Sequence, residues 1–594
     1  MMWIVYIHII FISLMFAIFS HDILCVTISK KIEKECYFMK KMTSQVKENR
    51  SQETTKAVTN FMGGVSYEIN PLDTLRMVSA SSIFGEPAYY RNGMFGEKTI
   101  HDGKYSVDRL MTEYAIAALD KYKGMTTSAL MEKVIDDALT YDFKAVLDWA
   151  ITLRNDYLMR LNPQVIMVRA ALHNGRQDFT AKNPGYFNKV QQEVMSRGDD
   201  VISQVTYILF LNKSKSKIPS ILKRSWANKV SSLSRYELYK YRNHGIGLID
   251  TVRICHASGK NIDELMTTGT IEVDDNQTTW ETLRAGGADW VGILQQIKMP
   301  HMALLRNLRG IFKEIDDRAK CSEVLENLKG GVLKGKQFPF RYLSAYNAVN
   351  ADHGVNHKGI IKDGLEDCMD VSCQNLPKLA GKNAFLSDNS GSAWGTFNSE
   401  YGSVTVAEID NLSAVIGAVN SDEGYVFPFG DRLARMDVSK RKGILDQSKT
   451  VSQKGRTLGG GTECGIWLFF DEAIRNKEHW DNIFIYSDMQ AGHGGLYGTD
   501  AEVRKFSAKG FAVNHRYINV PKLIEEYRRT VNPKVNVYCI QTAGYNNVLV
   551  PEYAYRCNIL YGWTGKEILF ADAMNKFWDE KDAEKASKKS QKNA

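Results

Sequence analysis

The hydrophobic pattern of this chain changes near residue 380, and that change constrains the fold more than any other feature. From about residue 106 to residue 345, apolar residues recur at helical spacing in segments such as "DRLMTEYAIAALDKY" and "FKAVLDWAITLRNDYLMRL", with short polar breaks between them. After residue 380, short apolar strands alternate with helices. A chain of 594 residues is too long for one hydrophobic core, so the two patterns predict two architectures.

The helical part predicts a repeat architecture. Its helices of about 12 to 20 residues follow one another without strand-like alternation and without a heptad repeat long enough for a coiled coil. Such a series is typical of stacked helical pairs of the HEAT or armadillo type, whose curvature creates a concave surface.

The second part predicts an α/β fold. Buried strands are expected at "NAFLSD", "GYVFPFGD", "NIFIYSD", "VNVYCIQT" and "CNILYGW", with helices between them and a last helix at "KEILFADAMNKFW". This alternation indicates a mostly parallel, doubly wound sheet with helices on both faces. Such sheets bind ligands beyond the carboxyl ends of their strands.

Oxygen-bearing side chains gather at these predicted strand ends. The strand "NAFLSD" runs into an alternating D-x-S-x-S, a glycine-rich loop precedes a later helix, and "NIFIYSD" ends in a carboxylate. Together they supply Asp388, Ser390, Ser392, Thr462 and Asp488. Because these are hard oxygen donors without His or Cys, they favour Mg²⁺ or another hard divalent cation over zinc.

Catalytic interpretations of the same residues fit less well. The spacing around Ser392 is not the G-x-S-x-G of a nucleophile elbow, and the second position after Asp388 is a serine where an aspartyl-phosphate enzyme would favour a carboxylate. The glycine-rich loops lack the G-K-[ST] ending of a P-loop. A metal-dependent hydrolase remains as a rival, but no general base accompanies the motif. We therefore expect a protein that is not an enzyme.

Positive charge is concentrated between residues 211 and 260. This window has eleven Lys or Arg against Glu237 and Asp250, a net charge of +9, whereas the whole chain carries +8. The basic residues alternate with Trp226, Tyr236, Tyr239 and Tyr241, so the window offers both charge for phosphates and rings for bases. A solvated helix surface is the alternative for such a run, but the one-sided charge favours nucleic acid. Lys223 and Arg224 are candidate contacts.

The strand-end motifs resemble the metal-ion-dependent adhesion site of von Willebrand factor A domains. D-x-S-x-S at one strand end, a threonine in a glycine-rich loop and Ser-Asp at a later strand end occur here in that order. The resemblance implies a bound Mg²⁺ and, as one function, a protein-interaction scaffold that recruits a partner through the metal.

The helical part resembles the TROVE module of the Ro autoantigen family. The resemblance is carried by "NFMGGVSYEINPLDTLRMVSASSIFGEPAYY", "LSRYELYKYRNHGIGLIDTVRICHASG", "MPHMALLRNLRGIF" and "FPFRYLSAYNAV". It implies a HEAT-like helical ring closed by a von Willebrand factor A domain. It also implies binding of small non-coding RNAs, the Y RNAs, on a basic outer face, and of single-stranded ends of misfolded RNA in the hole of the ring.

The resemblance also implies particular contacts. Lys240, Arg242 and His256 fall where the family contacts Y RNA, although His256 could instead cap its helix or fill the core. Arg306 and Arg309 lie three apart, on one helical face, and could line the hole. Arg306 could equally be a buried partner of a carboxylate. An exoribonuclease is a further expected partner, and DNA is not expected.

The domain boundaries follow from these patterns. We expect an N-terminal extension over residues 1–59, a TROVE ring over 60–370, a von Willebrand factor A-like domain over 380–576 and a disordered, solvated tail over 577–594.

The location expected for the protein is the cytoplasm. Nine cysteines without a disulfide framework indicate a reducing compartment. The apolar segment 2–19 is a borderline membrane span and lacks the features of a secretory signal. We favour a translation start at Met39 or Met42, so that this segment is not made and membrane association is not expected.

Overall fold

The computed structural model describes most of the chain between residues 57 and 593. The described residues are 57–59, 65–68, 70–80, 127–155, 159–211, 218–242, 247–273, 278–335, 339–374, 376–394, 405–460, 465–487, 489, 512–513, 517–518, 520–542, 547–550, 555–561 and 567–593. The chain divides into two compact units, one of Thr55–Ile568 and one of Met1–Thr54 with Leu569–Ala594. Of the second unit, only part of the last helix is described.

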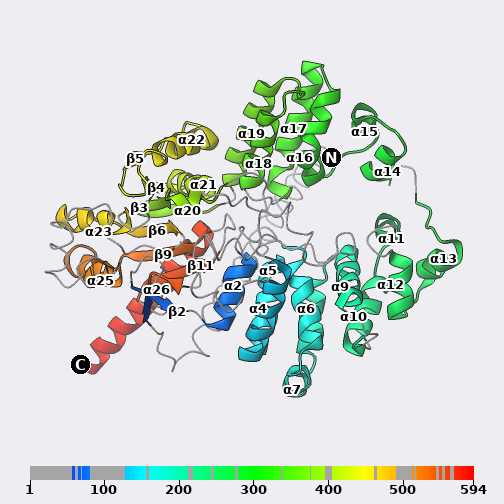
Figure 1. Cartoon of the computed structure of the whole chain (residues 1–594), viewed down its shortest axis with the longest axis horizontal. Coiled ribbons are helices and arrows are strands. Elements are labelled where there is room, and N and C mark those ends of the chain that lie inside the picture. The colour runs from blue at the N-terminus through cyan, green and yellow to red at the C-terminus, as the bar shows by residue number, and fades with distance from the viewer. Residues whose placement is uncertain are drawn as a thin grey trace, which may run out of the picture. The chain divides into compact units, whose positions relative to one another are not determined.

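A series of helices occupies the described residues between 71 and 373, as the sequence predicted (Figure 1). They are α2 (Pro71–Ala80), α4 (Thr127–Tyr141), α5 (Phe143–Asn155), α6 (Asn162–Leu172), α7 (Arg176–Lys182), α8 (Tyr186–Val194), α9 (Gly198–Leu211), α10 (Ser220–Ser231), α11 (Arg235–Tyr241), α12 (Leu248–Cys255), α13 (Lys260–Thr268), α14 (Trp280–Ala285), α15 (Trp290–Gln296), α16 (His301–Glu314), α17 (Arg318–Gly335), α18 (Pro339–Ala351) and α19 (Lys358–Cys373).

These helices pack against near neighbours in the sequence. α5 packs on α6, α16 on α17 and α18 on α19, and further contacts join α6 to α9 and α10 to α12. The longer helices turn an apolar stripe inward, as α10 does with Leu222, Trp226 and Val230, which recur every four residues and are fully buried.

A six-stranded sheet follows, in the order β11-β9-β6-β3-β4-β5. Its strands are β3 (Leu379–Asp388), β4 (Ser421–Phe429), β5 (Met436–Asp437), β6 (Asn482–Ser487), β9 (Asn536–Gln541) and β11 (Cys557–Tyr561). The pairs from β11 to β4 are parallel, and only the short edge strand β5 is antiparallel. The sheet is therefore mixed, with the predicted parallel arrangement in its centre.

Helices cover both faces of this sheet. They are α20 (Gly391–Trp394), α21 (Val406–Val419), α22 (Ile444–Gly455), α23 (Gly465–Arg475) and α25 (Val520–Thr530). On one face Phe385 stacks on Phe484, and Phe484 on Tyr538, with ring centroids 4.6 and 4.7 Å apart. Gly417 of α21 packs on this stack, because a Cβ there would lie 2.2 Å from the Phe385 ring. The other face joins Leu386 and Ile485 to α23 and α25 in one apolar core.

Two smaller sheets were not expected from the sequence. One has the order β1-β2-β10 and contains β1 (Ala57–Thr59), β2 (Val65–Glu68) and β10 (Asn547–Val548). It pairs the start of the described chain with a late segment, in antiparallel register. The other is the short pair β7 (Ala512–Val513) and β8 (Tyr517–Ile518).

The last helix differs from the expected tail. α26 spans Glu567–Asn593, so residues 577–593, which we expected to be disordered, are helical. The Ala, Lys and Glu residues that suggested a solvated tail are also strong helix formers, and Lys576 and Asp572 make an ion pair at i,i+4 spacing with a distance of 2.7 Å.

Among the helices that the structure describes, none is both long and apolar enough to cross a bilayer. The apolar segment 2–19 lies outside the described residues.

Candidate functional site

The first candidate site lies at the carboxyl end of β3, in the centre of the sheet. Asp388 is the last residue of this strand and is fully buried. Its Oδ1 accepts a hydrogen bond from the backbone N–H of Ser390 at 2.9 Å, and its Oδ2 accepts one from the Ser487 hydroxyl at 2.7 Å. Because Ser487 ends the neighbouring strand β6, the carboxylate holds two strand ends together.

The two predicted serines lie beside this carboxylate. The hydroxyl oxygens of Ser390 and Ser392 are 3.0 Å apart. Ser390 is buried and Ser392 is half-buried, at the start of the short helix α20. Three of the five predicted oxygen ligands are therefore brought together on one loop.

The other two predicted ligands, Thr462 and Asp488, lie outside the described residues. Their described neighbours do contact the loop. The Gly391 N–H donates to the Gly460 carbonyl oxygen at 2.7 Å, and Ser487, the residue before Asp488, donates to Asp388. The described neighbours of both ligands thus contact the segment from Asp388 to Gly391.

A further carboxylate was missed by the sequence reasoning. Asp431 follows the end of β4, and its Oδ2 accepts a hydrogen bond from the Gly460 N–H at 3.1 Å. The sequence contains a signal for Asp431, because "GYVFPFGD" also carries a carboxylate just after an apolar strand. Asp431 therefore belongs to the same strand-end set.

Buried side-chain amides hold the loop that follows β3. The Asn411 side-chain amide of α21 donates to Asn389 Oδ1 at 2.9 Å and to Ser452 Oγ of α22 at 3.0 Å. Its own Oδ1 accepts from the Ser387 hydroxyl at 2.7 Å and from Asn389 Nδ2 at 3.0 Å. A loop held in this way keeps its oxygens in place without a bound ligand, which lowers the ordering cost of binding.

The donor set suits a hard cation. A buried carboxylate with two hydroxyls 3.0 Å apart offers the oxygen ligands that Mg²⁺ prefers, with waters completing an octahedron. Within the described ranges, no group of three or more His, Cys, Asp or Glu could hold a metal ion. The histidines of "HGVNHKG", His353 and His357, are spaced four apart but belong to no such group, and the His357 Nε2 lies 2.6 Å from the Asp316 carbonyl oxygen.

The second candidate site is the basic surface formed by α10, α11 and α12. Lys223 of α10 is half-buried and Arg224 is exposed. Burial raises the pKa of the Cys255 thiol, and the nearby Lys223 ammonium opposes that rise, which places Lys223 close to the end of α12. His256 follows Cys255, so Lys223 and His256 belong to one region of the surface.

His256 ends α12 and leaves its ring exposed. Its backbone is left-handed, with φ 58°, and its N–H donates to the Val252 carbonyl oxygen at 2.8 Å. The alternative that this histidine caps its helix is therefore correct for the backbone. The exposed ring remains available to a ligand, and the alternative of a core histidine is wrong.

Lys240 and Arg242 lie at the end of α11. Lys240 is exposed, and its ammonium lies 5.6 Å from the centroid of the Tyr241 ring. The Arg242 guanidinium carbon lies 3.8 Å from the centroid of the Tyr239 ring, and its Nη1 donates to the Tyr239 carbonyl oxygen. Arg242 is thus held in one orientation by its own helix.

Two of the basic residues in the window are neutralised. Arg235 pairs with Glu264, and Arg253 pairs with Asp250 at 3.4 Å. Within the described part of the chain, Lys223, Arg224 and Lys240 form no ion pair. Together with Arg242 and Lys229, for which the described residues likewise provide no ion pair, they contribute positive charge to the surface.

The aromatic platform predicted for this window is only partly present. Trp226 is fully buried and its indole N–H donates to Gln204 Oε1 at 2.8 Å, and Tyr241 is only 7% exposed. Neither ring can stack on a base. Tyr236 and Tyr239 are half-buried and remain accessible.

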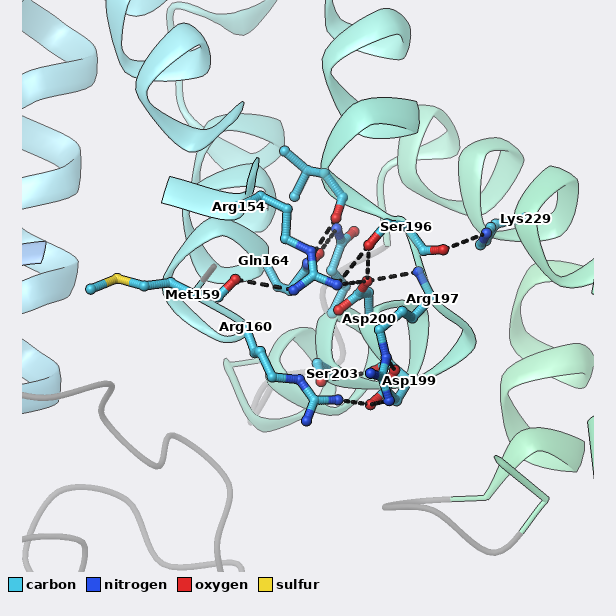
Figure 2. Close-up of polar contacts among 12 residues, drawn as sticks. Arg154, Met159, Arg160, Gln164, Ser196, Arg197, Asp199, Asp200, Ser203 and Lys229 are labelled. Atoms are coloured by element: carbon cyan, nitrogen blue, oxygen red, sulfur yellow. Dashed lines mark hydrogen bonds and ion pairs between the residues drawn. The ribbon is translucent and has the colours of Figure 1, made fainter. Parts of the chain in front are cut away.

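A buried ion network supports this surface (Figure 2). Asp200 at the start of α9 accepts hydrogen bonds from Arg154 of α5 at 2.7 Å and from the Arg197 N–H at 2.8 Å. Burial raises the pKa of Asp200, although the Arg154 charge opposes that rise. Lys229 of α10 donates to the Ser196 carbonyl oxygen at 3.1 Å, so the network ties α10 to α9.

Arg306 and Arg309 form a third group, on α16. Both are exposed, while Leu304, Leu305 and Leu308 are buried on the other side of the helix. The alternative of a buried Arg306 paired with a carboxylate is therefore wrong. Arg309 lies 3.6 Å from Asp352, which also binds Lys313 at 2.8 Å.

Comparison with known proteins supports one of the resemblances. Residues 275–362 match the family model of the TROVE domain. This segment contains α16 and the two motifs "MPHMALLRNLRGIF" and "FPFRYLSAYNAV", so the predicted resemblance to the TROVE module is confirmed over these residues.

Among solved structures, the chain is similar to the crystal structure of the Deinococcus radiodurans Ro (RSR) protein. The TM-score is 0.49 and the sequence identity 14%, over 74% of this chain and 92% of that chain. No curated protein matches the sequence.

Proposed function

With the TROVE match at residues 275–362 as premise, we propose that this chain is the protein core of a Ro-like ribonucleoprotein. It binds small structured, Y-like non-coding RNA on a basic outer face. It holds single-stranded 3′ ends of misfolded RNA in the hole of a helical ring and acts in RNA quality control in the cytoplasm, with an exoribonuclease as a protein partner and no role for DNA or a membrane.

The observation that carries this proposal is the basic surface of α10 to α12. Lys223, Arg224, Lys240 and Arg242 are at least partly exposed and unpaired with any described carboxylate. A surface that neutralises several phosphates gains affinity by releasing counterions, and this affinity falls as salt rises. The exposed His256 at the end of α12 adds a hydrogen-bonding group to this surface.

The proposed single-strand site uses Arg306 and Arg309. Their exposure on one side of α16 suits contacts with the phosphates of an RNA end. Arg309 shares Asp352 with Lys313, so we assign the stronger contact to Arg306.

Purification of the native protein tests the proposal directly. We expect a small RNA to co-purify and the purified protein to bind an RNA hairpin with a single-stranded 3′ end. The double variant Lys240→Ala/Arg242→Ala should weaken binding and lower the slope of log affinity against log salt by about 0.9 for each phosphate that the protein no longer neutralises.

A control variant distinguishes loss of the proposed RNA site from loss of overall positive charge. Lys182→Ala/Lys189→Ala removes two exposed lysines of α7 and α8 and should leave both affinity and salt slope unchanged. Absence of any co-purifying RNA, together with salt-independent binding, would overturn the proposal. An equal loss in both double variants would remove the α10 to α12 surface from it.

We also propose that the sheet part is a von Willebrand factor A-like domain that binds Mg²⁺ through Asp388, Ser390, Ser392, Thr462 and Asp488 without catalysing a reaction. The loop at Asp388 favours a second candidate function, a scaffold that recruits a protein partner through the metal. When bound, the cation would supply an open coordination position for a partner's carboxylate.

Metal binding can be measured without a partner. Mg²⁺ should raise the unfolding temperature of the wild-type protein, because a ligand that binds only the folded state stabilises it, whereas Asp388→Asn should show no such rise. If the scaffold function is correct, Asp388→Asn loses a protein partner and keeps RNA binding. Turnover of a phosphoester that Asp388→Asn abolishes would contradict the non-enzymatic proposal.

A further inference from the structure

The end of α11 carries an arginine, Arg242, that makes two contacts with Tyr239 in its own turn. The Arg242 guanidinium carbon lies 3.8 Å from the centroid of the Tyr239 ring, which is a stacking distance. Its Nη1 donates to the Tyr239 carbonyl oxygen, and within the described residues it makes no ion pair. One face of the guanidinium plane is therefore covered by a ring, and the side chain remains partly exposed.

The ring beneath this guanidinium also contacts the facing helix α14 (Trp280–Ala285). The Tyr239 hydroxyl lies 3.5 Å from the Thr282 hydroxyl of α14. This contact to Thr282, followed by weaker effects that include Arg242, lowers the pKa of the Tyr239 phenol. α14 has no buried residue, so its contact to α11 does not come from a shared apolar core. The pair Tyr239 and Arg242 thus forms a two-layer stack that also contacts α14 through Thr282.

The surroundings of the stack favour a polyanion. Lys240 is exposed on the same turn of α11. Glu281 is the acidic residue of the facing helix α14. Burial raises the pKa of Tyr236, which lies one turn earlier on α11, and the Glu281 charge raises it further. Glu237 lies on α11 itself: burial raises its pKa, but hydrogen bonds from Ser234 and the charges of Lys229 and Lys240 lower it. Within the described residues, Arg242 makes no ion pair with either carboxylate.

We propose that the Tyr239 and Arg242 stack is a binding site for one unpaired base of RNA, which lies on the outer face of the guanidinium while the adjacent phosphate faces Lys240. This inference rests on the proposed RNA-binding function and specifies how the α11 part of the surface distinguishes unpaired from paired nucleotides. A guanidinium plane stacks on any base, and a base inside a duplex has no free face to offer.

The alternative is a plain phosphate contact. A phosphate would approach the edge of the guanidinium and bind any RNA backbone, paired or not. Lysine can replace arginine in such a point contact, whereas lysine has no planar face for stacking. The two modes therefore differ in how they respond to Arg242→Lys.

Three hairpins and the full-length protein test the site. One hairpin has a single bulged purine, the second has an abasic residue at the bulge, and the third is a fully paired stem. We expect the wild-type protein to bind the purine bulge about 5- to 160-fold more tightly than the abasic bulge, the range for stacking of one base. Arg242→Lys and Tyr239→Leu should abolish this preference while the paired stem binds Arg242→Lys as it binds wild type.

Arg253→Lys is the matched control. Arg253 lies on the neighbouring α12, is exposed and pairs with Asp250, so its replacement should keep the preference for the purine bulge. Unchanged thermal unfolding of Arg242→Lys would show that the loss is local. The inference is wrong if Arg242→Lys keeps the preference, or if wild type binds all three hairpins equally, a result that leaves the proposed function intact. Failure of wild type to bind any hairpin would instead overturn the proposed function.

Discussion

The carboxylate Oδ2 of Asp388 lies 2.7 Å from the hydroxyl oxygen of Ser487, although the two residues are 99 positions apart in the sequence. Both atoms are fully buried side-chain groups at the ends of adjacent parallel strands. This hydrogen bond joins two strand ends at the candidate metal site. The Ser487 hydroxyl also accepts a hydrogen bond from the Met489 N–H at 3.0 Å.

Ser487→Ala should therefore destabilise the fold. The substitution removes the hydroxyl donor from a buried carboxylate and the acceptor from the Met489 N–H, and we expect a loss of about 1–3 kcal/mol in the free energy of unfolding. Urea unfolding monitored by circular dichroism measures it. Thr450→Ala, which removes an exposed hydroxyl from α22, should change stability by less than about 0.5 kcal/mol. Equal effects would mean that the Asp388 bond contributes nothing specific.

Removing one partner of the ion pair between Arg154 and Asp200 should lower the free energy of unfolding strongly. Both side chains are buried, with 7% and 2% exposed, and their atoms are 2.7 Å apart. Arg154→Ala leaves Asp200 charged without its main partner, so we expect a loss of about 3–5 kcal/mol. Arg154→Met/Asp200→Leu should recover much of this loss because it removes both charges.

The surface pair of Arg253 and Asp250 provides the comparison, since its side chains are 64% and 58% exposed. Arg253→Ala should cost less than about 1 kcal/mol in the same urea experiment. A double variant no more stable than Arg154→Ala would show that the pair acts through packing and not through its charges.

The sequence predicts the centre of the fold well because the relevant signals are local. The strands β3, β6, β9 and β11 are apolar runs, and helical segments lie between β3 and β4, between β5 and β6, and after β11, so the alternation indicates parallel pairing. The smaller sheet of β1, β2 and β10 has no such signal, because it pairs segments from opposite ends of the chain and its register depends on tertiary contacts.

Some predicted site residues lie where the sequence placed them and others do not, and the difference has physical reasons. Asp388, Ser390 and Ser392 lie together because they follow one another on a single strand end. Composition alone assigns Trp226 to RNA, although its spacing from Leu222 and Val230 places it on the apolar side of α10. For Arg306, periodicity predicted the shared face with Arg309 but could not decide whether that face was covered.

Stability should fall in acid partly through Glu478. Burial raises the pKa of this carboxyl, but hydrogen bonds from Lys382 at 2.9 Å and Arg435 at 2.8 Å outweigh that effect and hold the pKa below the ordinary value of 4.5. A carboxyl with a lowered pKa in the folded state contributes stability at pH values above 4.5, and this contribution is lost as the pH falls through the folded-state pKa.

Glu478→Gln should remove that part of the pH dependence. Below pH 4.5, the ordinary pKa of the carboxyl, the free energy of unfolding of the wild type should fall more steeply than that of the variant, as measured by urea titrations at a series of pH values. Parallel curves for the two proteins would contradict the assignment. Glu423→Gln serves as a control, because Glu423 lies 3.7 Å from Lys382 and is 52% exposed.

The two proposed RNA surfaces should be separable by mutation. Arg306→Ala/Arg309→Ala removes two exposed charges from α16 and leaves its buried leucines in place, so the helix should fold normally. We expect weaker binding of a single-stranded RNA, with a salt slope lower by about 0.7 for each phosphate that is no longer neutralised. Binding of a blunt hairpin to the α10 to α12 surface should remain unchanged. Lys240→Ala should show the opposite pattern. If a variant in either group weakens the binding of both RNAs equally, the arginines of α16 and the lysines of α10 to α12 serve one continuous site.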